Sequence, residues 1–230
     1  MVLLKERIEI IKQEIEAVLK KRKDKFITGE HVQIVAVSKT RSSKEVQEVL
    51  AAGINILGEN KVQEGKTKKA QVLGGTWHLI GHLQTNKIKQ AVANFQLIHS
   101  VDSERVLLEI ENKAKEQGKI QEILLQVNIA AEDSKFGLKE LEVLPLAKLA
   151  TGLTHIKLRG LMIIGPHTTD QELIRSVFKK GYSFFVELQK ILPEADVLSM
   201  GMSADYLIAI EEGSNMVRIG SKIFGERNYN

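Results

Sequence analysis

Eight short apolar segments alternate with amphipathic helical segments along this chain, and this alternation is the feature that most constrains its fold. Strands separated by a helix pair in parallel, because the chain needs a crossover to return to the same end of the sheet. Residues 33–37 (QIVAV) are typical of a strand buried on both faces. The predicted strands are 33–37, 55–57, 77–80, 95–98, 123–127, 158–164, 197–198 and 216–219.

The helical segments complete the same pattern. Apolar residues recur at three- and four-residue spacing in residues 3–23, and residues 43–52 follow Ser42 or Ser43 as the N-cap and end before Gly53. Eight strand–helix units in 230 residues fit a closed (β/α)8 barrel, the TIM barrel of the α/β class, better than an open doubly wound sheet. We therefore expect one domain over residues 1–230, with an extra N-terminal helix. The other predicted helices are 61–72, 86–93, 103–117, 138–151, 170–192 and 204–212.

Composition excludes several classes of protein. The net charge is +4, which is too mild to imply nucleic acid, and the basic run at residues 20–25 is typical of a solvated helix end. Without cysteine the chain has no disulfide framework, no thiolate zinc site and no cysteine nucleophile. No apolar run is long enough to span a membrane, and the N-terminus lacks the apolar stretch of a secretory signal. We expect a cytoplasmic protein without a membrane partner.

In a TIM barrel the functional residues follow the carboxyl ends of the strands. Lys39 follows the first strand, where partial removal from water favours the neutral amine. A neutral amine attacks a carbonyl and forms a Schiff base. The alternative is a structural lysine that only reaches solvent at the rim of the barrel.

The last two units predict a phosphate site. Ser203 follows the seventh strand, while Gly220 and Ser221 follow the eighth, and each segment leads into a helix. Barrels often bind phosphate at these two loops through backbone N–H groups and small hydroxyls. Arg218 lies on the eighth strand itself, so we expect its guanidinium to point into the mouth of the barrel.

A lysine opposite a phosphate site fits two ligand classes, a phosphorylated sugar as in lysine aldolases and pyridoxal 5′-phosphate (PLP). A metal site is disfavoured. His78 and His82 fall on a strand and its exit, the other histidines are scattered, and no carboxylate cluster accompanies them.

Seven motifs, spread from residue 35 to residue 227, resemble the pyridoxal phosphate homeostasis protein family. In chain order they are VAVSKT, GENKVQE, WHLIGHLQTNK, KFG, RGLM, LSMGMSAD and VRIGSKIFGER. The resemblance implies a barrel of the fold-type III PLP group, similar to the N-terminal domain of alanine racemase.

The resemblance also implies a role for each site residue. Lys39 would hold PLP as a Schiff base, Asn60 would lie near its ring, and Arg218 would face the pyridine nitrogen. Such a cation disfavours protonation of that nitrogen and weakens the electron sink needed for carbanion chemistry. Ser203, Gly220 and Ser221 would hold the phosphate, and Met200, in the LSMGMSAD motif, is also expected at the cofactor.

Three functions remain open, and the third is a Schiff-base aldolase that acts on a sugar phosphate. The first is a PLP-binding protein of vitamin B6 homeostasis without robust turnover, with PLP as its ligand and apo-PLP-enzymes as candidate recipients. The second is a fold-type III enzyme such as an amino-acid racemase, which needs a second base. Tyr182 and Tyr206 lie in predicted helices, Tyr229 lies at the terminus, and about ten residues follow Gly220. These features favour the binding protein and, without a racemase-like second domain, a monomer.

Overall fold

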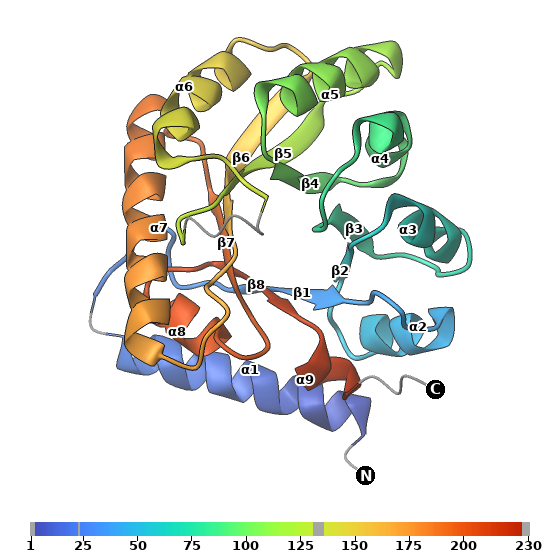
Figure 1. Ribbon diagram of the computed structural model, residues 1–230. Helices are drawn as coiled ribbons and strands as arrows, with labels where there is room; N and C mark the ends of the chain where they lie inside the picture. The colour runs from blue at the N-terminus through green and yellow to red at the C-terminus, as the bar shows by residue number, and fades with distance from the viewer. Residues whose placement is uncertain (1–2, 23, 131–135, 227–230) are drawn as a thin grey trace.

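Strand β1 (Gln33–Val37) pairs in parallel with β2 (Ile56–Glu59) on one side and with β8 (Met216–Ile219) on the other. All eight strands follow one another in chain order around a closed barrel, so this computed structural model confirms the predicted (β/α)8 fold (Figure 1). The structure describes residues 3–22, 24–130 and 136–226. The other strands are β3 (Thr76–Leu79), β4 (Leu97–Val101), β5 (Gln121–Val127), β6 (Ile156–Ile163) and β7 (Val197–Met202).

Helices surround the barrel on its outer face (Figure 1). Their buried apolar side chains pack against the outward-facing side chains of the strands in one continuous core. No helix of the described residues is long and apolar enough to cross a membrane. The helices are α1 (Leu4–Lys21), α2 (Ser43–Ala51), α3 (Val62–Lys69), η1 (Thr85–Lys87), α4 (Ile88–Asn94), α5 (Glu104–Glu116), α6 (Glu140–Thr151), α7 (Gln171–Ile191), α8 (Tyr206–Glu211) and α9 (Ser221–Phe224).

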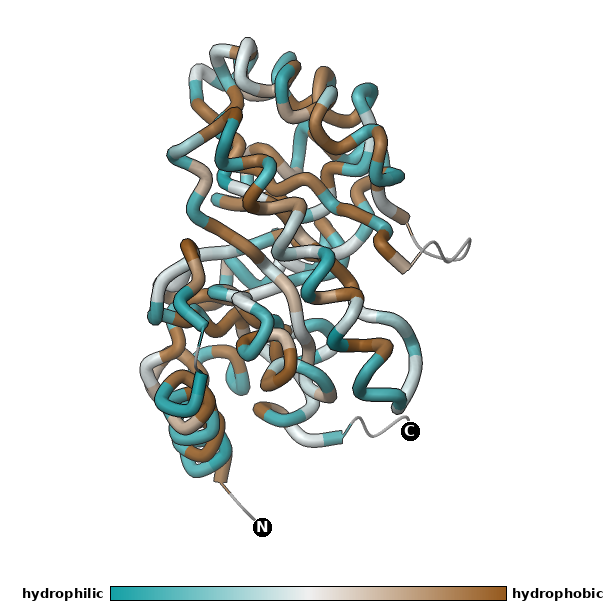
Figure 2. Tube along the Cα trace, turned by 90° about the vertical axis from the view of Figure 1, so that its left-hand side faces the viewer, coloured by the Kyte–Doolittle hydropathy of each residue, from teal (hydrophilic) through white to brown (hydrophobic). Residues whose placement is uncertain are grey.

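Helix α1 is the predicted extra helix. Figure 2 shows hydrophilic and hydrophobic residues interspersed along it, and its buried face is formed by Ile8, Ile11 and Ile15. On the same helix the Glu14 carboxylate accepts hydrogen bonds from the Tyr206 hydroxyl of α8 and from the Lys222 ammonium of α9. Helix α1 therefore packs on the two helices that follow β7 and β8.

Strands β1 and β8 have the predicted bounds, whereas β7 continues four residues beyond its prediction. In the sequence, Ser199 and Gly201 suggest the end of a strand. In the structure, Ser199 lies within the strand and its hydroxyl contacts His99 inside the barrel. Gly201 has a φ of 92°, a conformation that glycine adopts without strain. Gly160 permits the close approach of β6 to β7, because a Cβ there would lie 1.8 Å from the Val197 carbonyl oxygen.

The barrel interior holds an apolar cluster and, beside it, a polar one. The apolar cluster is formed by Val35, Leu97, Leu124, Met162, Val197 and Met216. In the polar cluster His99 is fully buried, with 3.0 Å between His99 Nε2 and His78 Nδ1 and 3.3 Å between His99 Nδ1 and Ser199 Oγ. Burial lowers the pKa of His78 to about 3 and, together with the charges of His78 and Arg218, lowers the pKa of His99. Both rings are therefore neutral at neutral pH.

These neutral histidines make stability depend on pH. In the unfolded chain His78 regains its ordinary pKa of 6.5, so the unfolded chain binds a proton between pH 6.5 and about 3 that the folded chain does not. Full stability is thus present above pH 6.5 and falls as the pH is lowered. We expect His78→Asn to reduce the slope of the unfolding free energy in this range by about 1.4 kcal/mol per pH unit.

The measurement is a series of urea titrations between pH 7 and pH 4. The exposed His31 supplies the control, since His31→Asn leaves the buried pair in place. Equal slopes for His78→Asn and the wild-type protein would contradict the expectation.

Candidate functional site

A cavity of about 630 Å³ opens at the carboxyl ends of the strands. This is the size of a small-molecule site. Six of the seven site residues predicted from the sequence line it: Lys39, Asn60, Ser203, Arg218, Gly220 and Ser221. They follow or belong to β1, β2, β7 and β8, so the closure of the barrel brings the two ends of the chain to one cavity.

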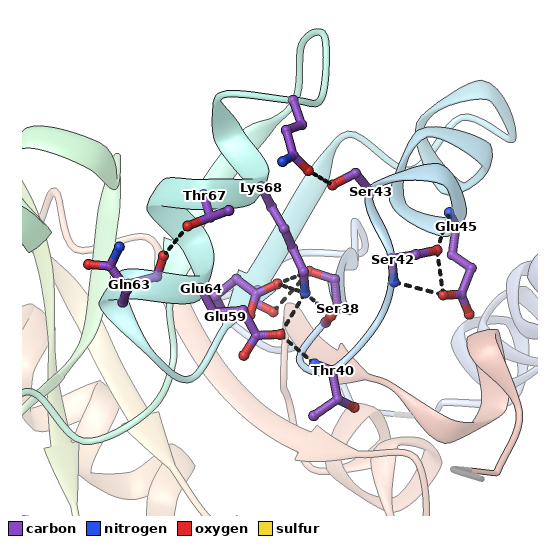
Figure 3. A network of polar contacts seen from close by, with 12 residues as sticks. Ser38, Thr40, Ser42, Ser43, Glu45, Glu59, Gln63, Glu64, Thr67 and Lys68 are labelled. Atoms are coloured by element: carbon purple, nitrogen blue, oxygen red, sulfur yellow. Dashed lines mark hydrogen bonds and ion pairs between the residues drawn. The ribbon is translucent and has the colours of Figure 1, made fainter. Parts of the chain in front are cut away.

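Lys39 lies in the turn that follows β1 and is half-buried. The turn starts from a sheet contact, with Ser38 N–H donating to the Gly58 carbonyl oxygen at 3.0 Å. Thr40, the next residue after Lys39, has a φ of 65°, a left-handed conformation that is strained for a β-branched side chain. Figure 3 shows polar side chains gathered behind this turn, on the side of α3.

The predicted phosphate loops meet in space. The Gly220 N–H donates a hydrogen bond of 3.1 Å to Ser203 Oγ, which joins the loop after β7 to the loop after β8. A Cβ at Gly220 would make only ordinary contacts, the nearest being Val37 Cβ at 3.4 Å. Protein packing therefore does not demand glycine there, whereas the missing side chain leaves room in the cavity for an anion beside two hydroxyl groups.

Arg218 forms part of the wall between the barrel interior and the cavity. Its Nη1 donates to the Ser199 carbonyl oxygen and to Ser199 Oγ at 2.9 and 2.8 Å, and its Nη2 donates to the Ile163 carbonyl oxygen at 2.9 Å. Burial lowers the pKa of Arg218 to about 10, against the opposing effect of the Asp205 carboxylate. The guanidinium is thus a cation at neutral pH, held in one orientation.

The same contacts fix the histidine tautomers. Since a guanidinium only donates, Ser199 Oγ accepts from Arg218 and can give its own hydrogen to His99 Nδ1. Neutral His99 then carries its hydrogen on Nε2 and donates to His78 Nδ1. Arg218 is therefore braced by a directed chain of hydrogen bonds that runs across the barrel interior.

Met200 does not line the cavity. Its side chain is fully buried in the outer core between strands and helices, because successive residues of β7 face opposite sides of the sheet. The methionine that lines the cavity is Met202, which lies in the same motif two residues further on.

Arg41 is a cavity residue that the sequence analysis missed. Its Nη2 donates to the carbonyl oxygens of Gly225 and Glu226 at 2.5 and 3.3 Å, so it joins the turn after β1 to the segment after α9. Its place two residues after Lys39 was the available signal, but the VAVSKT motif ends before it.

His82 and Asp102, which follow β3 and β4, lie outside the cavity lining. His82 Nδ1 lies 3.2 Å from Asp102 Oδ2, and the His82 ring stacks on Phe136 with 3.6 Å between ring centroids. Among the residues that the structure describes, no three His, Asp or Glu side chains form a group that could hold a metal ion. Lys135 of the KFG motif and Arg227 of the last motif lie outside the described residues, as does Tyr229.

Comparison with known proteins places this barrel among its relatives. The family model of the alanine racemase N-terminal domain matches residues 11–228. The pyridoxal phosphate homeostasis protein of Vibrio alginolyticus is 39% identical over 208 residues, which cover 88% of this chain and 89% of the relative. The protein of the same name from Haemophilus influenzae is 36% identical and covers 98% of this chain and 97% of its own.

Solved structures agree with these matches. PipY of Synechococcus elongatus PCC7942, solved without PLP, has a TM-score of 0.86 and 32% identity, covering 97% of this chain and all of its own. The structure of PipY with PLP bound has a TM-score of 0.77 and 34% identity, covering 92% of this chain and all of its own. Alanine racemase of Clostridium difficile 630, at 16% identity and a TM-score of 0.71, shares the fold over 95% of this chain and 57% of its own. The chain belongs to the pyridoxal phosphate homeostasis protein family, whose barrel resembles the N-terminal domain of alanine racemase.

Proposed function

We propose that this protein binds PLP in the cavity at the carboxyl ends of its strands, holds it covalently on Lys39, and serves PLP homeostasis without robust turnover. The observation that carries the proposal is that an amine, a buried cation and two hydroxyls line one cavity of cofactor size. The structure of PipY with PLP bound and the names of the curated relatives support the same ligand.

The residues present fit the chemical groups of PLP. PLP supplies an aldehyde, which condenses with a lysine amine to form a carbon–nitrogen double bond, with release of one water molecule. Among the described residues that line the cavity, Lys39 is the only lysine. Ser203, Ser221 and the backbone at Gly220 are assigned to the phosphate, and Asn60 to the ring. Arg218 is assigned to the ring nitrogen, where a fixed cation disfavours protonation.

The same arrangement argues against strong carbanion chemistry. A ring nitrogen kept unprotonated by Arg218 is a weak electron sink. A two-base racemase also needs a proton donor on each face of the substrate, and the Tyr206 hydroxyl is bound to Glu14 on α1 instead. The Tyr182 hydroxyl accepts from the Ile27 N–H, and no described tyrosine lines the cavity. An amino-acid racemase therefore remains the second candidate.

Replacing Lys39 tests the covalent step. Borohydride reduction of the wild-type protein with PLP should add one PLP to the peptide that contains Lys39, and Lys39→Ala should lower the adduct from roughly one per chain to below about one tenth. Mass spectrometry of the digested protein measures this. The exposed Lys44 on α2 provides the control, since Lys44→Ala should keep the adduct. An undiminished adduct in Lys39→Ala would contradict the assignment of Lys39 as the lysine that binds PLP.

Turnover is tested separately on the PLP-loaded protein. With excess PLP and L-alanine, we expect D-alanine to form no faster than with free PLP, because Arg218 weakens the electron sink and the described tyrosines offer no second base. Chiral chromatography measures the two enantiomers. Rapid formation of D-alanine that is lost in Lys39→Ala would favour the racemase instead. The single-domain organisation over residues 1–230, the cytoplasmic location, the monomeric state and the apo-enzyme recipients stay predictions.

A further inference from the structure

A buried ammonium group lies between the turn that carries Lys39 and the backbone of helix α3 (Figure 3). Lys68, on α3, is 6% exposed, and its Nζ contacts three oxygens: the Ser38 carbonyl oxygen at 2.5 Å, Glu59 Oε1 at 2.8 Å and Glu64 Oε1 at 2.7 Å. An ammonium group has three hydrogens, so these contacts use its full donor capacity. The site described above gives Lys68 no role.

The contacts of this cluster reach both neighbours of Lys39. On the N-terminal side, the Ser38 carbonyl accepts from Lys68, and Ser38 Oγ donates to Glu59 Oε1 at 2.6 Å. On the C-terminal side, the Thr40 N–H donates to Glu64 Oε1 at 2.5 Å, the same oxygen that contacts Lys68. One ammonium thus connects the backbone before and after Lys39.

The turn needs such support because its backbone is strained. Among the residues that the structure describes, Thr40 is the one non-glycine residue with a positive φ. A β-branched residue keeps this conformation only where its surroundings hold it. The hydrogen bond from Thr40 N–H to Glu64 stabilises this conformation, and Glu64 is itself held by Lys68.

The charges of the cluster depend on Lys68. Burial would raise the pKa of Glu64, but hydrogen bonds from Lys68 and the Thr40 N–H outweigh this and lower it, so Glu64 is a carboxylate at neutral pH. Burial raises the pKa of Glu59 more than its hydrogen bonds from Lys68 and Ser38 lower it. Glu59 Oε2 is buried and has no hydrogen-bond partner among the described residues. Without Lys68, the buried carboxyl group of Glu59 and the partly exposed one of Glu64 would face each other without a shared cation and release the turn.

We propose that Lys68 is a positioning residue that, through Ser38 and Glu64, fixes the turn on both sides of Lys39 and so directs the Lys39 amine toward the ligand aldehyde. This inference rests on the proposed function, in which Lys39 binds PLP. It goes further by separating the two parts of binding: Lys68 serves the covalent step, and the loops after β7 and β8 serve the phosphate.

The test compares PLP with pyridoxine 5′-phosphate, which has the phosphate and the ring but no aldehyde. In Lys68→Met, we expect Schiff-base formation with PLP, followed by absorbance after rapid mixing, to be about 10- to 100-fold slower than in the wild-type protein. The affinity for pyridoxine 5′-phosphate, measured by calorimetry, should stay within about twofold, because the Lys68 ammonium bonds to Ser38, Glu59 and Glu64 while the phosphate is assigned to the loops after β7 and β8.

The adjacent Lys69 is the matched control. Its Nζ donates to the Asn94 carbonyl oxygen at 2.6 Å, on the side of α4, so Lys69→Met should leave both measurements unchanged. If Lys68→Met does not fold, Glu64→Ala replaces it as the test variant in the same two measurements, with the same expected results. Glu64 is partly exposed, and its loss removes the acceptor of the Thr40 N–H.

Each outcome decides the proposal. Slower Schiff-base formation with unchanged binding of pyridoxine 5′-phosphate supports it. An unchanged rate, or an equal loss of both, overturns it, since an equal loss means that Lys68 only stabilises the fold. A wild-type protein that forms no adduct at Lys39 overturns the proposed function and this inference together, whereas a wild-type adduct with an unaffected variant overturns this inference alone.

Discussion

Strand β1 pairs in parallel with β8, with Ala36 opposite Ile219, and this pairing closes the barrel. Parallel strands in register end at the same side, so the turn that follows β1 and the segment that follows β8 emerge side by side. Lys39 lies in this turn, Ser221 begins α9 directly after Gly220, and both line one cavity. Residues from the two ends of the chain share a site because the barrel has no open edge.

The two sides of the cavity are supported in different ways. Arg218 lies on a strand and is held by carbonyl and hydroxyl oxygens of the barrel wall, which offset the cost of burying a cation. Lys39 lies in a turn beside the strained Thr40 and depends on side chains of β2 and α3 outside the cavity. In the proposed complex, a rigid wall faces the ring and phosphate of PLP, and the turn held by Lys68 presents the amine of Lys39.

Features of the fold that depend on neighbouring residues in the chain could be predicted from the sequence. Strands β1 and β8 were predicted to the residue because short apolar runs are bounded there by polar residues and glycine. That Lys39, Ser203, Arg218 and Ser221 line one cavity could be predicted, because the carboxyl ends of the strands of a barrel meet at one face. The full length of β7 was missed because Ser199 resembles a strand end until its partners inside the barrel are known.

The positions of Met200, Met202 and Lys68 could not be predicted because they depend on tertiary contacts. Met200 and Met202 occupy one motif, and residues two apart face the same side of a regular strand. Only the irregular register of β7 between Ser199 and Met202 separates the core residue from the cavity residue. Lys68 lies in the segment VQEGKTKK, where the sequence indicates a solvated lysine, and its buried role depends on Glu59 and Ser38 from two neighbouring strand ends. No spacing rule within α3 predicts that contact.

A crystal structure of the protein grown with PLP would show directly whether Lys39 holds the cofactor. We expect continuous density between Lys39 Nζ and the PLP aldehyde carbon, with the phosphate within hydrogen-bond distance of Ser203 and Ser221. Density that joins PLP to a different lysine, or a phosphate bound away from the loops after β7 and β8, would contradict this expectation.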